Sequence, residues 1–380
     1  MDEKLSALRA ELPAVDTQVY LNTGTSGPMP KRVHAAMLQE LERQLMQGRS
    51  GMAHFGEFFR LKDAIRPHLA ALLGCAPAEI AVTESTTAGM NLVTLGVNWQ
   101  PGDEAITTNL EHAGALLPLW SARERFGITV KVADIAGRPE AAAEVIGQLI
   151  TPRTKLISLS HVSYLTGAVL PVGEICELAH RHGVLVLVDG AQSFAAMDVN
   201  VKELGCDFYA GPGQKWVCGP EGVGVLYAAR EAVSQVAVTF AAYFTVDRYS
   251  FGGMLPHADA RKFEQGTAQG AVYAGYLEAL RWFREEVGPA WAYGRIRSLA
   301  RVAREGLLQV PGVRVLTPAD GAGLVTFQVA GKTHEAVVGA LTEKGITART
   351  VAEPGGVRIA TGFYNTEEEI RQVIDAVAAL

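Results

Sequence analysis

Long apolar runs and cysteines are scarce in this sequence, and their scarcity excludes several classes of protein. No apolar stretch reaches the length of a membrane span, and the charged N-terminus Met1–Leu5 is unlike a signal peptide. The four cysteines lie far apart and lack the spacing of a metal site. We therefore expect reduced, mostly buried thiols, no bound metal, no membrane association and a cytoplasmic location.

Basic runs are also missing, which argues against a nucleic-acid partner. Lysine and arginine number 34 against 40 acidic residues, and the formal net charge is -6 at pH 7, so the chain has no electrostatic footprint for nucleic acid. It has no P-loop and no G-x-G-x-x-G after a strand. The composition is that of a globular protein, and 380 residues suffice for a large core and two subdomains.

Apolar strands alternate with helices through the central part of the chain. This alternation predicts an α/β fold in which helices cover both faces of a mainly parallel, seven-stranded sheet. The expected strands cover 80–83, 104–108, 128–133, 155–160, 184–188, 206–209 and 223–227. The expected helices cover 3–12, 31–47, 56–73, 113–126, 139–149 and 173–182.

The pattern changes beyond about residue 255, where a long helical stretch precedes shorter strands. This change predicts a smaller α+β domain at the C-terminus. Its expected helices cover 270–308, 333–344 and 366–380, and its expected strands cover 324–329 and 357–360. The expected division is an N-terminal segment (1–19) that packs with the small domain, a large domain (20–255) and the small domain (256–380).

A carboxylate and a lysine mark the most informative part of the chain. Asp189 ends the apolar run 184–188, and Lys215 follows in a glycine-rich turn. Ligands bind outside the carboxyl ends of parallel strands. An acid there can keep the pyridine nitrogen of pyridoxal phosphate (PLP) protonated, and a lysine amine can form a Schiff base with its aldehyde. Taken singly, Asp189 would be a cap or turn residue and Lys215 a surface lysine. Their order and spacing together favour the cofactor.

Hydroxyls and an imidazole lie at the ends of two other expected strands. Ser85, Thr86 and Thr87 open a helix, where free amides and the helix dipole favour a phosphate. The same residues suit an N-cap, and the two interpretations are compatible. His112 could stack on the cofactor ring and move protons at the substrate carbon, although a lone histidine is more often structural.

Two arginines near the C-terminus suit an amino acid carboxylate. Arg358 lies on an expected strand and Arg349 lies shortly before it, and a planar guanidinium favours a bidentate bond to a carboxylate. The alternative is a surface arginine, and this alternative weighs most for Arg349. The substrate pocket is expected to be lined by the 22–28 loop with Thr25, by Tyr164, by residues around 243–244 and by the 349–358 loop.

Together these residues resemble the class V aminotransferase family of fold-type I PLP enzymes. The similarity runs from Tyr20-Leu-Asn-Thr-Gly to Phe363-Tyr-Asn-Thr-Glu. It implies a homodimer in which Thr267, within Phe263-Glu-Gln-Gly-Thr, reaches the phosphate of the neighbouring subunit. The resemblance implies that Lys215 carries the cofactor, with Asp189 on the pyridine nitrogen, Gln192 on the phenolic oxygen, His112 on the ring, Thr86 and Thr87 on the phosphate, and Arg358 on the substrate carboxylate.

Three departures from the family pattern bear on the reaction. Gln214 stands where a histidine often precedes the lysine, and its amide can still donate to the phosphate. Tyr164 stands near a position where many desulfurases have asparagine, and we expect it to line the substrate pocket. A cysteine desulfurase also needs a nucleophilic cysteine ahead of the carboxylate-binding arginine, and the stretch 347–358 has none.

The missing cysteine moves the expected reaction from desulfuration toward elimination. The two arginines of the tail most resemble the cystine C–S lyase branch, so we predict a PLP-dependent lyase that acts on cystine or an S-substituted cysteine. An epimerase or racemase of the isopenicillin N epimerase type is an alternative, because that branch shares Gly213-Gln-Lys-Trp-x-Cys-Gly-Pro-Glu-Gly. An aminotransferase and a non-catalytic protein of the same fold are further alternatives.

Overall fold

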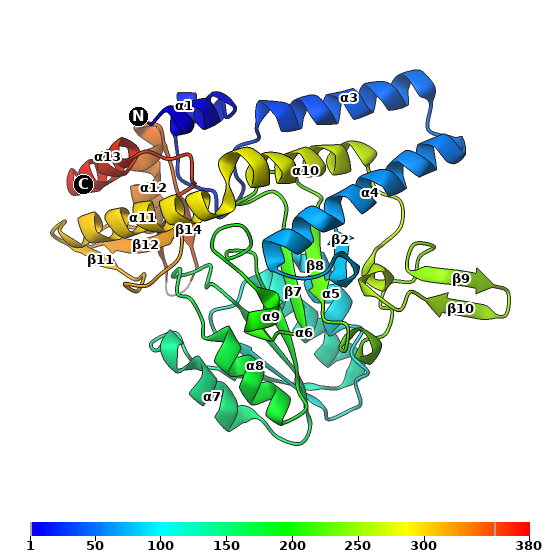
Figure 1. The fold of residues 1–380 in the computed structure, drawn as a ribbon. Helices are drawn as coiled ribbons and strands as arrows, with labels where there is room; N and C mark the ends of the chain where they lie inside the picture. The colour runs from blue at the N-terminus through cyan, green and yellow to red at the C-terminus, as the bar shows by residue number, and fades with distance from the viewer. Residues whose placement is uncertain (1, 353–354) are drawn as a thin grey trace.

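A seven-stranded sheet forms the centre of the larger part of the molecule (Figure 1). The strands are β2 (Ile80–Thr83), β3 (Glu104–Thr108), β4 (Thr129–Ala133), β5 (Thr154–Ser160), β6 (Leu185–Asp189), β7 (Phe208–Pro212) and β8 (Gly224–Ala228). The computed structural model describes residues 2–352 and 355–380. The strand order is β2-β8-β7-β6-β5-β3-β4. Strand β8 runs antiparallel to both neighbours, and the other neighbouring pairs run parallel. The expected mainly parallel α/β sheet is therefore confirmed.

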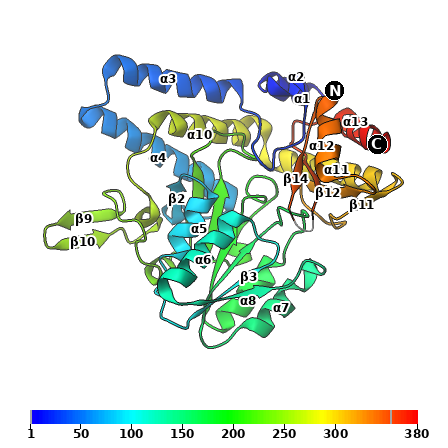
Figure 2. The ribbon, with the colours of Figure 1, turned by 180° about the vertical axis from the view of Figure 1, so that it is seen from behind.

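Alternate side chains of each strand enter different apolar cores. In β6, Leu185 and Leu187 belong to one cluster and Val186 and Val188 to another, as the two-residue period of a strand requires. The helices that cover the first face are α5 (Thr86–Thr94) and α6 (Ala113–Phe126). The second face is covered by α4 (Gly51–Leu73), α7 (Ala142–Leu149), α8 (Val172–Arg181) and α10 (Gly270–Trp282). Figure 2 shows α5 and α6 in front of the sheet and Figure 1 shows α8 on the opposite side.

A four-stranded antiparallel sheet forms the centre of the smaller part. Its strands, in sheet order, are β11 (Val313–Val315), β12 (Leu324–Val329), β15 (Gly356–Ala360) and β14 (Arg349–Val351). Its helices are α11 (Pro289–Leu308), α12 (His334–Glu343) and α13 (Glu367–Ala378). The apolar sides of these helices and of β11, β12 and β15 share one core. The smaller part is thus the α+β unit that the sequence pattern predicts.

The N-terminal segment lies against this smaller part. Strand β1 (Val19–Tyr20) pairs with β13 (Ile346–Thr347) in parallel. Arg9, in α1 (Glu3–Ala10), forms an ion pair with Glu369 of α13 at 2.9 Å. The chain then crosses to the large part through α3 (Lys31–Gln47), so the 22–28 loop runs between the two parts.

The helical stretch expected over 270–308 is present, but it is divided into two helices. The chain forms α10, a π-helical turn (Phe283–Val287) and then α11. Gly288 has a φ of 76° and Pro289 begins α11, so a left-handed residue and an absent amide donor separate the two helices. Helix α10 packs on α3 and α4. From Leu299 onward, apolar side chains of α11 belong to the core of the smaller part. We propose a domain boundary near Gly288 instead of residue 256.

A β-hairpin absent from the sequence-based prediction projects from the large part, at the right of Figure 1. It consists of β9 (Val246–Ser250) and β10 (Gly253–Pro256), paired antiparallel. Most of its side chains are exposed, including Tyr249 and Phe251. Because neither strand buries an apolar face, the sequence lacks the alternation that predicts a strand.

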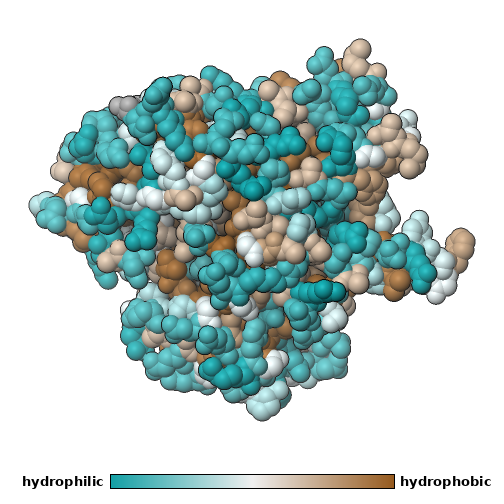
Figure 3. Space-filling model, in the orientation of Figure 1, coloured by the Kyte–Doolittle hydropathy of each residue, from teal (hydrophilic) through white to brown (hydrophobic). Residues whose placement is uncertain are grey.

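Hydrophilic residues cover most of the molecular face shown in Figure 3, with apolar residues scattered among them. Within the described ranges, no helix combines the length and the apolar character that crossing a membrane requires. Over the same residues, no group of three or more histidine, cysteine, aspartate or glutamate side chains could hold a metal ion.

Candidate active site

A pocket of about 220 Å³ lies at the carboxyl ends of the parallel strands. It is lined by Gly24, Thr25, Ser85, Thr86, Thr87, His112, Tyr164, Asp189, Ala191, Gln192, Pro212, Gln214, Lys215, Arg349 and Arg358. The site residues expected from the sequence are in this set, except Thr267 and the residues around 243–244. A larger cavity of about 750 Å³ lies beside α11 and the 317–323 segment and includes none of the expected residues. Residues 353 and 354 of the expected pocket loop lie outside the described residues.

Lys215 occupies a tight turn between β7 and β8. Gly213 donates its amide to the Val223 carbonyl at 2.9 Å. The Gly27 amide donates to the Gln214 carbonyl at 2.8 Å, so the 22–28 loop packs against this turn. Burial is the largest influence on the amine and lowers the pKa of Lys215 to about 8, which the carboxylate of Asp189 only partly offsets. An amine whose pKa lies this close to physiological pH loses its proton at little cost, which suits nucleophilic and base chemistry.

Asp189 ends β6 with its side chain buried beneath the pocket. The Ala191 amide donates to its carboxylate at 2.8 Å. Burial raises the pKa of Asp189, and the Ala191 amide, Lys215 and His112 act in the opposite direction. A buried carboxylate with so few donors favours a cationic partner, and the pyridinium nitrogen of PLP is such a partner.

The N-terminus of α5 provides a place for an anionic group. The Ser85 hydroxyl accepts the Ala88 amide at 3.0 Å and caps the helix. The Thr86 hydroxyl is buried and has no partner within the described parts of the chain. Because the first helical amides are free and the helix dipole is positive there, Thr86 and Thr87 are suited to a phosphate. Ser85 therefore acts as the cap that the sequence suggested, and the two threonines remain available.

Gly114 and Gly224 allow close approach to this helix end. A Cβ atom on Gly114 would lie 2.5 Å from the Thr87 hydroxyl. A Cβ atom on Gly224 would lie 3.0 Å from the backbone carbonyl carbon of Ser85. Both distances are shorter than ordinary van der Waals contacts, so the two glycines allow α5 its close approach at the pocket.

His112 lies at the N-terminus of α6 with its ring open to the pocket. Its Nδ1 atom accepts the Gly114 amide at 3.0 Å, so the neutral ring carries its proton on Nε2. The ring meets Tyr164 edge-on at 4.9 Å between centroids. Desolvation is the largest cause that lowers the pKa of His112, and the charge of Lys215 adds to it. The imidazole is therefore a neutral group that can lie against a cofactor ring.

Arg349 and Arg358 are directly opposite each other on β14 and β15. Both guanidinium groups donate to the Thr25 hydroxyl, at 3.2 and 3.3 Å. Arg358 also donates to the Tyr164 carbonyl at 3.0 Å, and its buried Nε has no partner among the residues described. Burial, followed by repulsion from Arg349, lowers the pKa of Arg358 to about 9. Two adjacent cations whose hydrogen bonds go to neutral oxygens make a strong site for a carboxylate.

Gln192 and Gly24 line another side of the pocket. The Gln192 side-chain amide donates to the Gly24 carbonyl at 2.8 Å, and its Oε1 atom is buried without a partner in the described ranges. A Cβ atom on Gly24 would lie 2.8 Å from Leu324 and 3.1 Å from Gln192 Oε1. Gln192 is thus fixed next to Asp189 on the same strand end, where a second polar contact to a ring substituent is expected.

Thr267 lies outside the pocket of its own chain. Its hydroxyl forms a hydrogen bond with the hydroxyl of Tyr243. Neither residue lines the pocket, and Phe244 stacks on Phe58 at 5.5 Å instead. The expected contribution of residues around 243–244 to the pocket is therefore absent within a single chain.

Glu111 is a site residue that the sequence reasoning missed. It is buried directly before His112 and accepts the hydroxyls of Thr108 and Ser160, each at 2.6 Å. Burial raises the pKa of Glu111 to about 7, against the effect of the two hydroxyls. By joining the ends of β3 and β5, Glu111 fixes the loops that carry His112 and Tyr164. The Glu-His pair in the sequence was the available signal.

Comparison with known proteins gives the site a family context. The family model described as Aminotransferase class-V matches residues 19–373. Cysteine desulfurase CsdA of Escherichia coli (strain K12) is 31% identical, covering 97% of this chain and 96% of its own. Isopenicillin N epimerase of Streptomyces clavuligerus is 29% identical, covering 96% of this chain and 95% of its own.

Some curated relatives are longer than this chain. A probable cysteine desulfurase of Mycolicibacterium paratuberculosis is 34% identical over 83% of this chain, and a similar protein of Mycobacterium leprae is 34% identical over 80%. The match covers 48% of the first relative and 52% of the second, so the chain spans about half the length of these two relatives.

Among solved structures, the cystine C-S lyase C-DES in complex with its reaction product cysteine persulfide has a TM-score of 0.92 with this chain at 31% identity. The match covers 97% of this chain and 99% of that chain. A mutant of C-DES with glycine covalently linked to its PLP cofactor has the same TM-score of 0.92. The two-part fold is thus that of the fold-type I PLP enzymes.

Proposed function

Because the chain belongs to the class V aminotransferase family, we propose that it is a PLP-dependent C–S lyase that acts on cystine or an S-substituted cysteine. One observation carries the proposal. A single pocket contains a buried acid, a lysine with a lowered pKa, a helix N-terminus and two arginines that share the Thr25 hydroxyl. Solved relatives that bind PLP and cleave cystine have the same fold.

The residues around the pocket fit the cofactor. Asp189 would hold the pyridine nitrogen, and Thr86 and Thr87 would hold the phosphate, because the Thr86 hydroxyl is buried without a partner in the described chain. Gln192 and Gln214 would donate to the remaining oxygens of the ring and phosphate. When bound through Lys215, PLP supplies an electron sink for the bonds broken at the substrate Cα.

The chain's own residues then position the substrate and move the proton. Arg358, assisted by Arg349, binds the α-carboxylate through parallel N–H donors and so fixes the direction of the Cα–H bond. The Lys215 amine takes the Cα proton, which its pKa of about 8 permits. The Cβ–S bond breaks with its electron pair leaving on sulfur, as a thiolate or a persulfide. The three-carbon remainder reacts with water to give pyruvate and ammonia.

The position of the cysteines favours elimination over desulfuration. No cysteine occurs in the 347–358 stretch. Cys218 follows Lys215 closely but is fully buried, and burial raises its pKa far above the ordinary value. A thiol must ionise to attack sulfur. A persulfide on this chain by the usual route is therefore disfavoured.

Epimerisation is the second candidate, and the 29% identity to isopenicillin N epimerase favours it. Reversal of configuration needs an acid on the face of Cα opposite Lys215. His112 and Tyr164 lie in edge contact in the same pocket and are the candidates for that acid. Transamination would instead leave the cofactor in its amine form.

The proposal includes a homodimer in which Thr267 reaches the phosphate of the partner subunit. The projecting hairpin supports it, because Tyr249, Phe251, Met254 and Leu255 are exposed apolar side chains that a second copy could cover. Phe251 is as exposed as in an extended chain, at 115%. A cytoplasmic location, consistent with four cysteines outside any disulfide, is also part of the proposal.

The test is a product assay on the PLP-loaded protein with cystine, S-substituted cysteines and unsubstituted cysteine. We expect pyruvate and ammonia, and no product from Lys215→Ala. Alanine as the product would indicate desulfuration, and pyruvate at background level with every substrate would contradict the lyase proposal. Solvent deuterium at Cα with inversion and without pyruvate would select the epimerase.

A further inference from the structure

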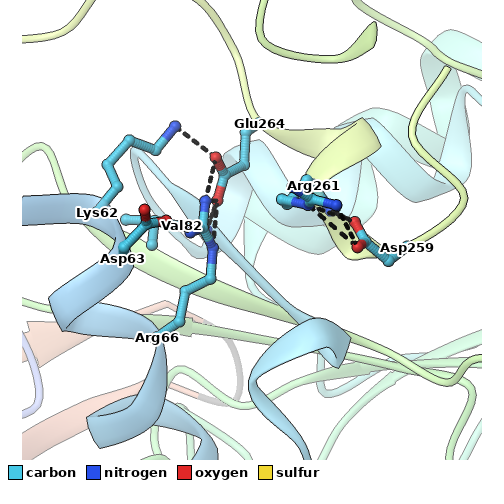
Figure 4. A network of polar contacts seen from close by, with 7 residues as sticks. All are labelled: Lys62, Asp63, Arg66, Val82, Asp259, Arg261 and Glu264. Atoms are coloured by element: carbon cyan, nitrogen blue, oxygen red, sulfur yellow. Dashed lines mark hydrogen bonds and ion pairs between the residues drawn. The ribbon is translucent and has the colours of Figure 1, made fainter. Parts of the chain in front are cut away.

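Glu264 lies at the centre of a buried ion-pair network that does not line the pocket (Figure 4). Its carboxylate binds Lys62 Nζ at 2.5 Å and Arg66 Nη2 at 2.7 Å, both from α4. The Val82 amide in β2 donates to the same carboxylate at 3.1 Å. The side chains of Glu264 and Lys62 are only 4% and 3% exposed. A charged group buried so completely holds its partners in fixed positions, since losing one leaves the others uncompensated.

On one side, Glu264 is connected to the phosphate-binding end of α5. Val82 lies in β2, and the chain runs from this strand through Glu84 to the Ser85 cap. Glu84 is partly buried, with an Oε2 atom that has no partner in the described chain. Burial raises the pKa of Glu84, the charge of Lys62 opposes this, and the charge of Glu264 adds to it. The network is thus in contact with the segment that presents Thr86 and Thr87.

On the other side, Glu264 is connected to Thr267 along the chain. Gln265 and Gly266 alone separate the two residues. The chain just before Glu264 is fixed as well, because the Lys262 ammonium donates to backbone carbonyls of the large part and Phe263 is buried in its core. Glu264 is therefore the last residue before Thr267 whose side chain is held by buried ion pairs.

Lys62 also contacts Phe244, the neighbour in sequence of the residue that bonds to Thr267. Its ammonium lies over the Phe244 ring, 5.1 Å from the centroid, at a distance that gives a cation–π attraction. The preceding residue, Tyr243, bonds to the Thr267 hydroxyl. Lys62 and Glu264 therefore support both members of this hydroxyl pair, which lies outside the pocket of its own chain.

We propose that Glu264 is a positioning residue that links two phosphate-binding segments, the α5 end of its own subunit through Val82 and the Thr267 segment that serves the partner subunit. The inference rests on the proposed PLP function and homodimer. It assigns the network to cofactor retention in both subunits rather than to the reaction itself. Loss of the carboxylate should loosen both segments, because it is the acceptor that Lys62, Arg66 and the Val82 amide share, and Arg66 alone would keep a second carboxylate, that of Asp63.

The first experiment is a PLP titration of the apoprotein of Glu264→Gln, followed by absorbance of the lysine-bound cofactor. We expect the apparent dissociation constant to rise by about tenfold, the loss of roughly one hydrogen bond to a charged phosphate, with kcat at saturating PLP changed less than twofold. The matched control is Glu104→Gln. Glu104 is also a buried carboxylate between a lysine and an arginine, Lys131 at 2.7 Å and Arg153 at 3.7 Å, but it begins β3, away from the carboxyl ends. It should leave PLP affinity at the wild-type value.

The second experiment separates the two subunits in hybrid dimers. One subunit carries Lys215→Ala together with Glu264→Gln and the other is wild type, so only the wild-type subunit can hold lysine-bound cofactor. Weaker retention in that subunit supports the link across the interface, and wild-type retention there overturns it. If Glu264→Gln fails to fold, Lys62→Met keeps Arg66 on the carboxylate and should raise the dissociation constant by a smaller factor.

The outcomes also separate this inference from the proposed function. Wild-type protein that binds no PLP overturns both. Wild-type protein that binds PLP and forms pyruvate, beside a Glu264→Gln homodimer of unchanged affinity, overturns the inference alone. A loss of affinity in Glu104→Gln equal to that in Glu264→Gln would also overturn it, because a general loss of stability would then explain the effect.

Discussion

Replacing Lys215 by methionine should stabilise the cofactor-free protein at neutral pH. The protein lowers the pKa of Lys215 from 10.5 to about 8, chiefly through burial. Each tenfold change in the protonation equilibrium corresponds to about 1.4 kcal/mol. Keeping the amine protonated in the folded apoprotein at pH 7 therefore costs up to about 3 kcal/mol. Methionine fills a similar volume without a charge and removes this cost.

The pH dependence gives the prediction its sign. Below about pH 8 the amine is protonated in both the folded and unfolded protein, so the whole cost is present. Between pH 8 and 10.5 the unfolded chain binds more protons than the folded one, so wild-type stability rises with pH. The advantage of the Lys215→Met variant should therefore shrink to about 1.4 kcal/mol at pH 9.5.

The assay is urea unfolding of stripped apoprotein at pH 7.0 and 9.5, followed by tryptophan fluorescence. Lys332→Met, which changes an exposed lysine, is the control and should alter stability little at either pH. The reasoning is refuted if Lys215→Met is no more stable than wild type at pH 7.0. It is equally refuted if the difference is the same at both pH values, since burial of a charge would then not be its cause.

Three further substitutions test other parts of the site. Asp189→Asn removes the buried anion expected on the pyridine nitrogen. We expect kcat for pyruvate formation to fall at least about 100-fold, which corresponds to about 3 kcal/mol of activation free energy. A smaller loss in steady-state assays would argue against this role. Arg358→Gln should raise KM about 10- to 100-fold, as expected for a lost charged hydrogen-bond pair, whereas an unchanged KM would place the carboxylate elsewhere. Gly27→Ala places a Cβ atom 2.7 Å from Cys218 Sγ and against the Lys215 carbonyl. We expect this variant to lose about 1–3 kcal/mol of folding stability and the melting temperature of the holoprotein to fall. An unchanged melting temperature would show that the 22–28 loop can move away.

The sequence predicted those parts of the fold in which the local pattern of apolar residues reflects which side chains are buried. The seven strands of the large sheet were expected close to their observed bounds because the central strands are buried on both faces, and β6 is therefore almost continuously apolar. Helices α3 and α6 were expected at their observed bounds, since each has an apolar side of helical period. Strands β9 and β10 were missed because they bury no face.

The break after α10 shows the limit of such patterns. Helical residues continue across Gly288 and Pro289, and the sequence alone left the position of the break open. The π-helical turn and the left-handed Gly288 decide it, and they separate a helix that packs on α3 from one that packs in the smaller core.

The sequence by itself determined which residues could carry PLP chemistry. Asp189 at a strand end and Lys215 in a glycine-rich turn are local features, and ligands bind at the carboxyl ends of the strands in a parallel sheet. Only the tertiary structure decided how these residues act. Arg349 and Arg358 come to share the Thr25 hydroxyl through pairing of β14 with β15. Glu111 and Glu264 were not singled out from the sequence, because the contacts of Glu111 with Ser160 and of Glu264 with Lys62 and Arg66 form only when the chain packs, and burial of a charge is a property of the packed molecule.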